Sequence, residues 1–487
     1  ARREWAEAER MAPLSIFRLW SQCAFLGSIG AEDEAEALLA RRESSGRVLW
    51  RGRFEYAKAA RELDRALACL KEMRDASPSE AVLALADAEI RSWRQDEGDL
   101  EAAADILRAI FAQSADAVRV AELLVRVLVL LGEPEDAARV VAAIPAADTR
   151  RSVAEVRLWT EVQNGDWRAA MKRWKKISDG FFLPALHLRK AELRVLGDKF
   201  KPASSGGVLA MSVIRNERPR LQEFLDHHRA LGVDGFVLVD NGSHDGSDAF
   251  LAAQPDVLLY ATDDSYAQSQ YGARWLNQLI DLHGRGWVLY ADADERLVFP
   301  GSESRSLTDL TGYMSARGEQ VLPGVMIDMF PRHAGETGPV AHDWFDPLRI
   351  RSSVTCPFIE AAGGARRRLF GTTVTLSKAP LINAGAGVRY LTSHATTPAL
   401  VSAVRAGLLH YHLDYLFDPS NVQRIRDEVA RAEHSDHAVD RRRSLAIMHA
   451  LSGADLKGPH SQRYKNSAQL QKLGLIATTK EFEATYG

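Results

Sequence analysis

The hydrophobic positions divide the chain into two parts with different periodicities. From about residue 14 to residue 196, apolar residues recur at helical spacing among Ala, Leu, Glu and Arg, which predicts an all-helical region. After the Pro-, Ser- and Gly-containing stretch 196–207, short apolar runs alternate with amphipathic segments, which predicts alternating strands and helices. We therefore expect a helical domain over 1–200, an α/β domain over 207–418 and a helical extension over 419–487.

Three segments of the helical part are similar to one another. GDLEAAADIL from Gly98, GEPEDAARVV from Gly132 and GDWRAAMKRW from Gly165 start 34 and then 33 residues apart, and each carries a pair of alanines. This period is typical of a helix–turn–helix solenoid, and the segments resemble the tetratricopeptide repeat, with a divergent earlier copy from Gly52. Such repeats form a concave face that binds proteins or peptides, and a purely architectural role is the alternative.

The second part begins with short runs that predict buried strands, at 208–214, 236–240, 257–261 and 287–290. Helical segments separate these runs. Strand–helix–strand alternation predicts a mostly parallel, doubly wound sheet of the Rossmann-like class. Open sheets of this class bind ligands beyond the carboxyl ends of their strands, and polar residues follow several of these runs.

The last of these strands runs directly into acidic residues, in GWVLYADADERLVF (286–299). In extended geometry Asp292 and Asp294 would point the same way, and two neighbouring carboxylates repel each other unless a cation neutralises them. Mg²⁺ or Mn²⁺ would do so, held by one or two carboxylates and substrate phosphates. A solvated acidic turn is the alternative, since two aspartates at this spacing are common.

Composition excludes several classes of protein. The 487 residues are 46% hydrophobic and 26% charged, with a net charge of −3, which indicates a globular protein and argues against nucleic-acid binding. The three cysteines, Cys23, Cys69 and Cys356, are widely spaced and favour a reducing compartment. We predict no transmembrane segment, because no apolar run reaches the roughly 18 residues that span a bilayer. We expect a cytoplasmic protein, with the periphery of the inner membrane as the alternative.

Five motifs occur together in the second part: IRNE (214–217), LVDNGSHDGS (238–247), YADADE (290–295), GGARRRLF (363–370) and KAPL (378–381). In this order and spacing they resemble the family 2 glycosyltransferases with the GT-A fold, particularly a bacterial branch whose acid motif reads D-A-D-E. The resemblance covers about residues 207 to 415. It implies sugar transfer from a nucleotide-sugar donor, but the W-G-G-E-D motif of polymerising members is absent, which leaves the catalytic base open.

The resemblance also implies roles for individual residues. The metal, Mn²⁺ or Mg²⁺, would be held by Asp292, Asp294, His410 and His412. Donor binding is expected from the strand-end and basic residues Asn216, Glu217, Asp240, Asn241, Asp245, Arg366, Arg368 and Lys378. Asx turns that bond their own backbone are the alternative for Asp240, Asn241 and Asp245, and a solvated face is the alternative for the arginines.

An inverting transferase needs a carboxylate that removes a proton from the acceptor hydroxyl. Asp328, which ends another apparent strand, is the first candidate for this base, and Glu295, Asp343 and Glu360 are rivals. The polar segment 335–346 has the length of a lid or acceptor loop.

The sequence therefore predicts a metal-dependent glycosyltransferase of polysaccharide biosynthesis. Its donor would be a UDP- or GDP-sugar, and its acceptor a glycan, a lipid-linked molecule or a protein, docked on the helical repeats. The alternatives are a nucleotidyltransferase of similar fold and a scaffold protein with an inactive transferase domain.

Overall fold

The structure is a computed structural model. It describes residues 16–28, 30–41, 46–60, 62–76, 81–113, 118–131, 133–144, 157, 191–201, 207–266, 269–336, 342–352, 359–371, 374–397, 399–413, 451 and 453–486.

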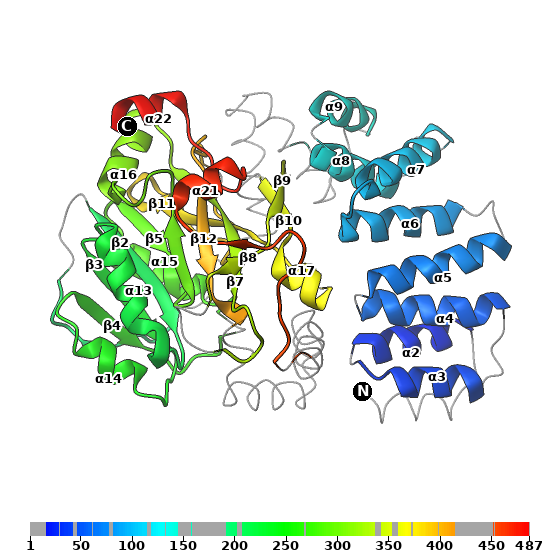
Figure 1. Ribbon diagram of the computed structural model, residues 1–487, viewed down its shortest axis with the longest axis horizontal. Coiled ribbons are helices and arrows are strands. Elements are labelled where there is room, and N and C mark those ends of the chain that lie inside the picture. The colour runs from blue at the N-terminus through cyan, green and yellow to red at the C-terminus, as the bar shows by residue number, and fades with distance from the viewer. Residues whose placement is uncertain are drawn as a thin grey trace.

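The first part of the chain is a stack of helices, shown at the right of Figure 1. The described helices are α2 (Ile16–Ser28), α3 (Glu32–Arg41), α4 (Gly46–Ala59), α5 (Leu63–Ala76), α6 (Ala81–Arg94), α7 (Asp99–Gln113), α8 (Val118–Leu131) and α9 (Pro134–Ala143). Gly98, at φ +78°, turns the chain into α7, and Pro134 begins α9. Ala103 and Ala137 are fully buried, as the close approach of repeat helices requires. The segment from Gly165 lies outside the described residues.

The second part is built on one large sheet. Its strands are β1 (Arg194–Gly197), β2 (Val208–Ile214), β3 (Gly235–Asp240), β4 (Val257–Ala261), β5 (Trp287–Tyr290), β6 (Glu295–Val298), β7 (Val321–Phe330), β11 (Ser377–Asn383) and β12 (Ala406–His410), in the spatial order β1-β4-β3-β2-β5-β11-β7-β12-β6. At one side β8 (Trp344–Phe345) pairs with β7 and with β13 (Gln462–Arg463), and β9 (Leu348–Ser352) pairs separately with β10 (Ile359–Gly363).

The expectation of a mostly parallel sheet is wrong, because the sheet is mixed. β2 pairs in parallel with β3 and β5, β3 with β4, and β7 with β12, whereas β1, β6 and β11 run antiparallel to their neighbours. A parallel crossover needs a dozen or more residues, and the connection from β5 to β6 has only four, 291–294.

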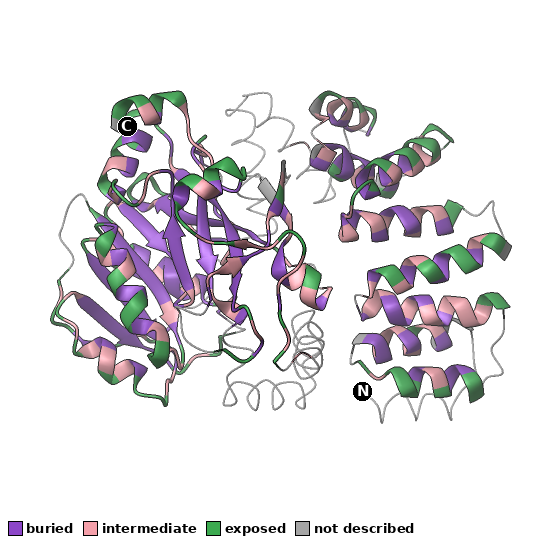
Figure 2. Ribbon diagram, viewed as in Figure 1, coloured by how far each residue is buried: buried purple, intermediate pink, exposed green. Residues whose placement is uncertain are grey.

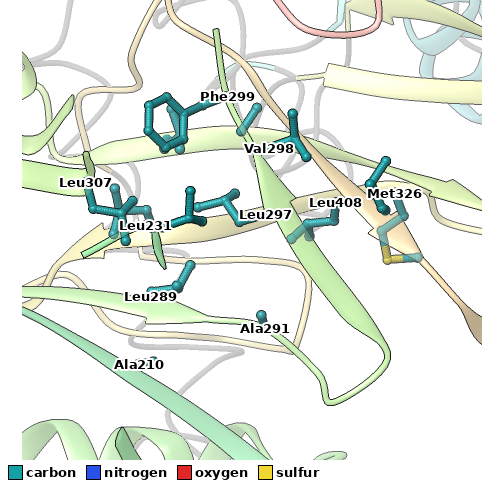
Figure 3. Packing of buried hydrophobic residues seen from close by; sticks show 14 of the residues in the cluster. Ala210, Leu231, Leu289, Ala291, Leu297, Val298, Phe299, Leu307, Met326 and Leu408 are labelled. Atoms are coloured by element: carbon teal, nitrogen blue, oxygen red, sulfur yellow. The ribbon is translucent and has the colours of Figure 1, made fainter. Parts of the chain in front are cut away.

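Helices cover both faces of the sheet. On one face lie α13 (Arg218–Ala230), α14 (Ser247–Ala252) and α16 (Leu307–Ala316), and on the other lies α15 (Ala273–His283). The strands between them are buried, as Figure 2 shows. Side chains of β3 alternate between the two cores: Phe236 joins the first, Val237 the second. Figure 3 shows the first core, in which Leu289 of β5 and Leu297 of β6 lie close together.

The domain limits differ from the expected ones at both ends of the sheet. β1 lies within the range expected to be helical, and it pairs with β4. At the C-terminus, α21 (Ser467–Lys472) and α22 (Lys480–Tyr486) are helical as expected, but Leu470 and Phe482 are buried in the first core of the sheet. The described part of the extension therefore belongs to the sheet domain, and 414–450 lies outside the described residues. Among the described helices, none has the length and apolar character that a membrane span requires.

Candidate metal centre and strand-end site

The acid motif forms a turn between β5 and β6. The backbone N–H of Glu295 donates to the carbonyl of Asp292 at 2.9 Å, and Asp292 N–H donates to the Glu295 carboxylate at 2.9 Å. Alternation of side chains across a strand does not apply in a turn, so the assumption of extended geometry was wrong. The carboxylates of Asp292 and Asp294 consequently have different partners.

Asp294 lies beside two histidines, His410 at the end of β12 and His412 just after it. Within the described ranges, Asp294, His410 and His412 form the group whose ligand atoms all lie within 4.8 Å of one another, as a shared metal ion requires. The Asp294 carboxylate is 3.6 Å from His410 Nε2 and 3.6 Å from His412 Nδ1. The two imidazole rings stack at 5.2 Å, and Tyr411 N–H donates to the Asp294 carbonyl at 2.8 Å.

Strand pairing brings these residues together from distant parts of the sequence. β12 lies between β6 and β7, so His410 is opposite Glu295 on one side and Asp328 on the other. The turn that holds Asp294 precedes β6 directly. The end of β12 therefore meets the acid motif.

Asp328 fixes the orientation of His410. One of its oxygens accepts a hydrogen bond from His410 Nδ1 at 2.8 Å, and the other accepts from Arg366 Nε at 2.8 Å. A carboxylate only accepts hydrogen bonds, so His410 carries a proton on Nδ1, and its Nε2 faces Asp294. Burial alone would raise the pKa of Asp328, but Arg366 and His410 hold it below its usual range.

Electrostatics favour a charged Asp294 and a neutral His412. Burial would raise the pKa of Asp294, but the charge of His410, a hydrogen bond with His412 and the charge of Arg220 hold it well below its usual range. Burial lowers the pKa of His412 to about 4, so its imidazole is neutral near pH 7. Burial would also lower the pKa of His410, but Asp294 and Asp328 raise it above the ordinary value. A metal ion binds a carboxylate and neutral imidazoles, which is the state that this site supplies once His410 Nε2 gives up its proton.

Asp292 and Glu295 are paired with a buried lysine. Lys378 Nζ donates to Asp292 at 2.8 Å and to Glu295 at 2.7 Å, and it lies 4.3 Å from the centre of the Tyr290 ring. Burial opposes the charge of Lys378, but the two carboxylates raise its pKa above the ordinary value. Burial raises the pKa of Glu295 despite this lysine. The structure thus places Lys378 among the acids, and it places Glu295 in the interior.

The two arginines expected at the donor phosphates diverge. Both belong to α17 (Gly364–Phe370), and Arg366 points to Asp328 while Arg368 donates to Asp346 at 2.6 Å and to the Leu456 carbonyl at 2.7 Å. Successive helical residues are 100° apart, so residues two apart face nearly opposite directions. Both guanidinium groups are engaged within the protein.

The other two candidate bases are Asp343 and Glu360. Asp343 pairs with Arg463 and is partly exposed. Its charge acts on Tyr411, whose pKa is raised mainly by burial. The side chain of Glu360 lies outside the described residues, as does 337–341 of the expected lid.

Polar residues at the ends of β2 and β3 form a second group. Asn216, which has φ +57°, bonds the loop after β3: its N–H donates to Ser243 Oγ at 2.9 Å, and its side-chain oxygen accepts from His244 N–H at 2.8 Å. Asp240 accepts from Ser243 N–H at 3.0 Å. Asp240 thus bonds the backbone of its own loop, three residues on, as a polar residue of a strand-ending turn does.

The other three residues of this group, Asn241, Asp245 and Glu217, bond to neighbouring loops or to α13. Asn241 donates to the carbonyls of Thr262 and Asp264, both at 3.0 Å, which ties the ends of β3 and β4 together. Asp245 accepts from Arg218 N–H at 2.9 Å. Glu217 precedes α13 and lies 3.1 Å from Arg220. All five expected strand-end residues therefore lie at the carboxyl edge of the parallel strands, where their donor-binding role stays a prediction.

Sequence reasoning missed three partners of the site. Tyr290 appeared only as a strand residue, but its hydroxyl donates to Asp292 at 2.9 Å. Arg220 lies in the first turn of α13, and its charge helps to lower the pKa of Asp294. Asp346 forms an ion pair with Arg368. No local signal marks any of them, because each pairing depends on the tertiary fold.

Comparisons with known proteins identify part of the helical domain. Residues 95–157 match the tetratricopeptide-repeat family. This match includes the segments from Gly98 and Gly132 and confirms the helical-repeat prediction for that region.

The remaining comparisons are distant. A variant of the O-GlcNAc transferase from Thermobaculum terrenum is a structural neighbour at 14% sequence identity and a TM-score of 0.27, covering 47% of this chain and 42% of its own. The chain thus spans less than half the length of that enzyme, and a likeness this low supports no inference about fold or activity. No curated protein sequence matches the chain.

Proposed function

We propose that this protein is a metal-dependent glycosyltransferase of the GT-A type, similar to family 2, that uses a nucleotide-sugar donor. The observation that supports this most is the grouping of Asp294, in the turn after β5, with His410 and His412 at the end of β12. β5 pairs with β2, whose end carries the polar strand-end group. A cation site and a group of polar residues at the same edge of a sheet suit a nucleoside diphosphate.

The residues present fit a divalent cation. Metal-binding histidines usually donate their second ring nitrogen to a carboxylate, and Asp328 accepts that bond from His410. Two imidazoles with one carboxylate favour Mn²⁺ over Mg²⁺, which prefers oxygen ligands. We therefore assign the metal to Asp294, His410 and His412, and we assign Asp292 to the pair with Lys378.

When bound, the cation would supply positive charge that neutralises the diphosphate leaving group. Two side chains support binding of the cation and the anionic donor. Asp328 keeps the proton of His410 on Nδ1, so that Nε2 can bind the metal. Lys378 offsets the charges of Asp292 and Glu295, so the acid motif repels an anionic donor less.

The geometry disfavours Asp328 and Glu295 as the base, because both are buried and engaged. We propose Asp343 instead, as a partly exposed carboxylate whose charge acts on Tyr411, the residue between the two histidines. An inverting mechanism would have it accept the acceptor's proton. Asp343→Asn should then lower kcat by about 100-fold, within the range for removal of a general base, while Mn²⁺ affinity stays unchanged. Unchanged turnover in this variant would remove Asp343 from the mechanism.

The test of the overall proposal is release of nucleoside diphosphate. The full chain is incubated with Mn²⁺ and a panel of UDP- and GDP-sugars, and Asp294→Asn is the negative control. Donor-dependent release that this variant lacks would support sugar transfer. Pyrophosphate release from a nucleoside triphosphate would instead indicate a nucleotidyltransferase. Absence of both from a folded protein that also binds no Mn²⁺ would favour the scaffold hypothesis.

The repeats provide the proposed acceptor surface. Stacked helical pairs present a broad concave face, and we infer that a glycan, lipid-linked or protein acceptor docks there. Cytoplasmic location and a role in polysaccharide biosynthesis stay predictions.

A further inference from the structure

The helical domain contacts the sheet domain through the turn between α6 and α7. The carbonyl of Gln95 accepts a hydrogen bond from the Arg349 guanidinium of β9, and the Asp96 carboxylate lies 3.5 Å from Arg367 Nη2 of α17. Nearby, α8 lies beside β9, as Figure 1 shows. Two consecutive residues of the repeat region thus meet two arginines of the sheet domain.

This turn is held in shape from inside the helical domain. Asp99, which is 1% exposed, accepts from Arg94 Nε at 2.8 Å, from Arg91 Nη1 at 3.1 Å and from Asp96 N–H at 2.9 Å. Gln95 has φ +54°, a conformation that a residue with a side chain adopts at a cost unless its surroundings impose it. These bonds therefore fix the conformation of the turn where it contacts the sheet domain.

On the other side of the contact, α17 reaches the candidate metal centre. Arg367 lies near the end of this seven-residue helix, and its Nη1 donates to the Gly371 carbonyl at 3.0 Å. Its neighbour Arg366 donates to Asp328, which orients His410. A short helix moves as one body, so the contact of Arg367 with Asp96 and the contact of Arg366 with Asp328 are linked.

We propose that the turn of Gln95 and Asp96 positions the metal centre. It holds α17, and through Arg366 and Asp328 it holds the imidazole of His410. This inference rests on the metal site of the proposed function. Asp96, Arg367 and Arg366 are positioning residues, since none of them contacts the metal ligands' binding atoms.

The test measures Mn²⁺ affinity by calorimetry on the full chain, without donor or acceptor. Asp96→Arg places a second cation against Arg367 and should weaken Mn²⁺ binding about 3- to 10-fold, less than the roughly 10- to 100-fold typical of a residue that bonds a ligand directly. Asp105→Arg is the matched control, because Asp105 lies exposed on α7 beside Arg108 and should leave affinity unchanged. The charge swap Asp96→Arg with Arg367→Asp should recover part of the loss, which a merely structural defect would not.

The outcomes separate the two proposals. If the unmodified chain binds no Mn²⁺, the proposed metal site fails. If the unmodified chain binds Mn²⁺ and Asp96→Arg binds it equally well, the positioning role of the turn is overturned. If circular dichroism shows that Asp96→Arg does not fold, Asp96→Ala takes its place, because it removes the charge and retains the backbone bond to Asp99; an affinity equal to that of the unmodified chain would again refute the inference.

Discussion

Asp328→Asn separates two roles for the carboxylate at the end of β7. As a catalytic base, Asp328 would be needed for proton removal and not for the metal. As the residue that orients His410, it would be needed for Mn²⁺ binding itself. Asparagine has nearly the same shape, so the substitution changes the charge and the hydrogen bonds and leaves the packing of β7 almost unaltered.

The structure sets the size of the effect. Asp328 is fully buried and accepts from His410 and from Arg366, which is 13% exposed. Loss of a carboxylate that supports a metal-binding histidine costs about 10- to 100-fold in metal affinity. Removal of one partner from a buried ion pair costs about 3–5 kcal/mol, and we expect the lower end, about 3 kcal/mol, because asparagine can still accept one bond.

The assays are Mn²⁺ titration calorimetry and urea unfolding, and Asp346→Asn is the control. Asp346 forms an ion pair at 2.6 Å with Arg368, which lies on α17 as Arg366 does. Neither His410 nor His412 is its partner. Its arginine is 31% exposed whereas Asp346 itself is 9% exposed, so the loss of stability should be smaller than for Asp328, and the control should bind Mn²⁺ normally.

One result would refute the reasoning. If Asp328→Asn binds Mn²⁺ as tightly as the control but loses turnover, Asp328 acts as the base and does not orient His410. If it loses Mn²⁺ affinity while the control retains it, the positioning role is supported.

Three further predictions concern the rest of the site. Asp294→Asn should weaken Mn²⁺ binding by at least about 100-fold in calorimetry, because it removes the charged metal ligand, and unchanged affinity would exclude Asp294 from the site. Lys378→Met should lower the free energy of unfolding by about 3–5 kcal/mol in urea, since it leaves the buried Glu295 carboxylate beside Asp292 without a cation; a loss below about 1 kcal/mol would contradict that pairing. Asn216→Ala should cost about 1–2 kcal/mol through its left-handed backbone, whereas Asn216→Gly should cost less, and thermal unfolding compares the two.

Local signals were sufficient to locate the elements of the sheet. β2 and β4 occupy the residues that their apolar runs predicted, 208–214 and 257–261, and β3 begins one residue earlier than expected. Strand direction could not be predicted in the same way. β11 lies antiparallel between β5 and β7, from which it is distant in sequence, so its direction depends on pairing that no local pattern records.

The membership of the site was more predictable than its pairings. The resemblance grouped His410 with Asp294, and the structure brings the two side chains together. The partners of Lys378 and Arg366 were not foreseen, since a basic residue near phosphate-binding motifs has the same sequence signature whether it binds a ligand or a buried carboxylate. Only the burial of Lys378 beside Asp292 and Glu295 distinguishes the two uses.

The sequence divides the chain into a helical repeat domain and an α/β domain. That division followed from the change in hydrophobic periodicity near residue 200, and the candidate site motifs all lie after residue 207. The structure connects the two parts at places that carry no motif: β1 completes the edge of the sheet beside β4, and Asp96 faces Arg367. Removal of the chain before residue 204 would expose the edge of β4 as well as separate the repeats, so loss of metal binding in such a protein would not by itself locate the cause. Substitution at Asp96 leaves β1 in place, and it therefore isolates the contribution of the repeats to the metal centre.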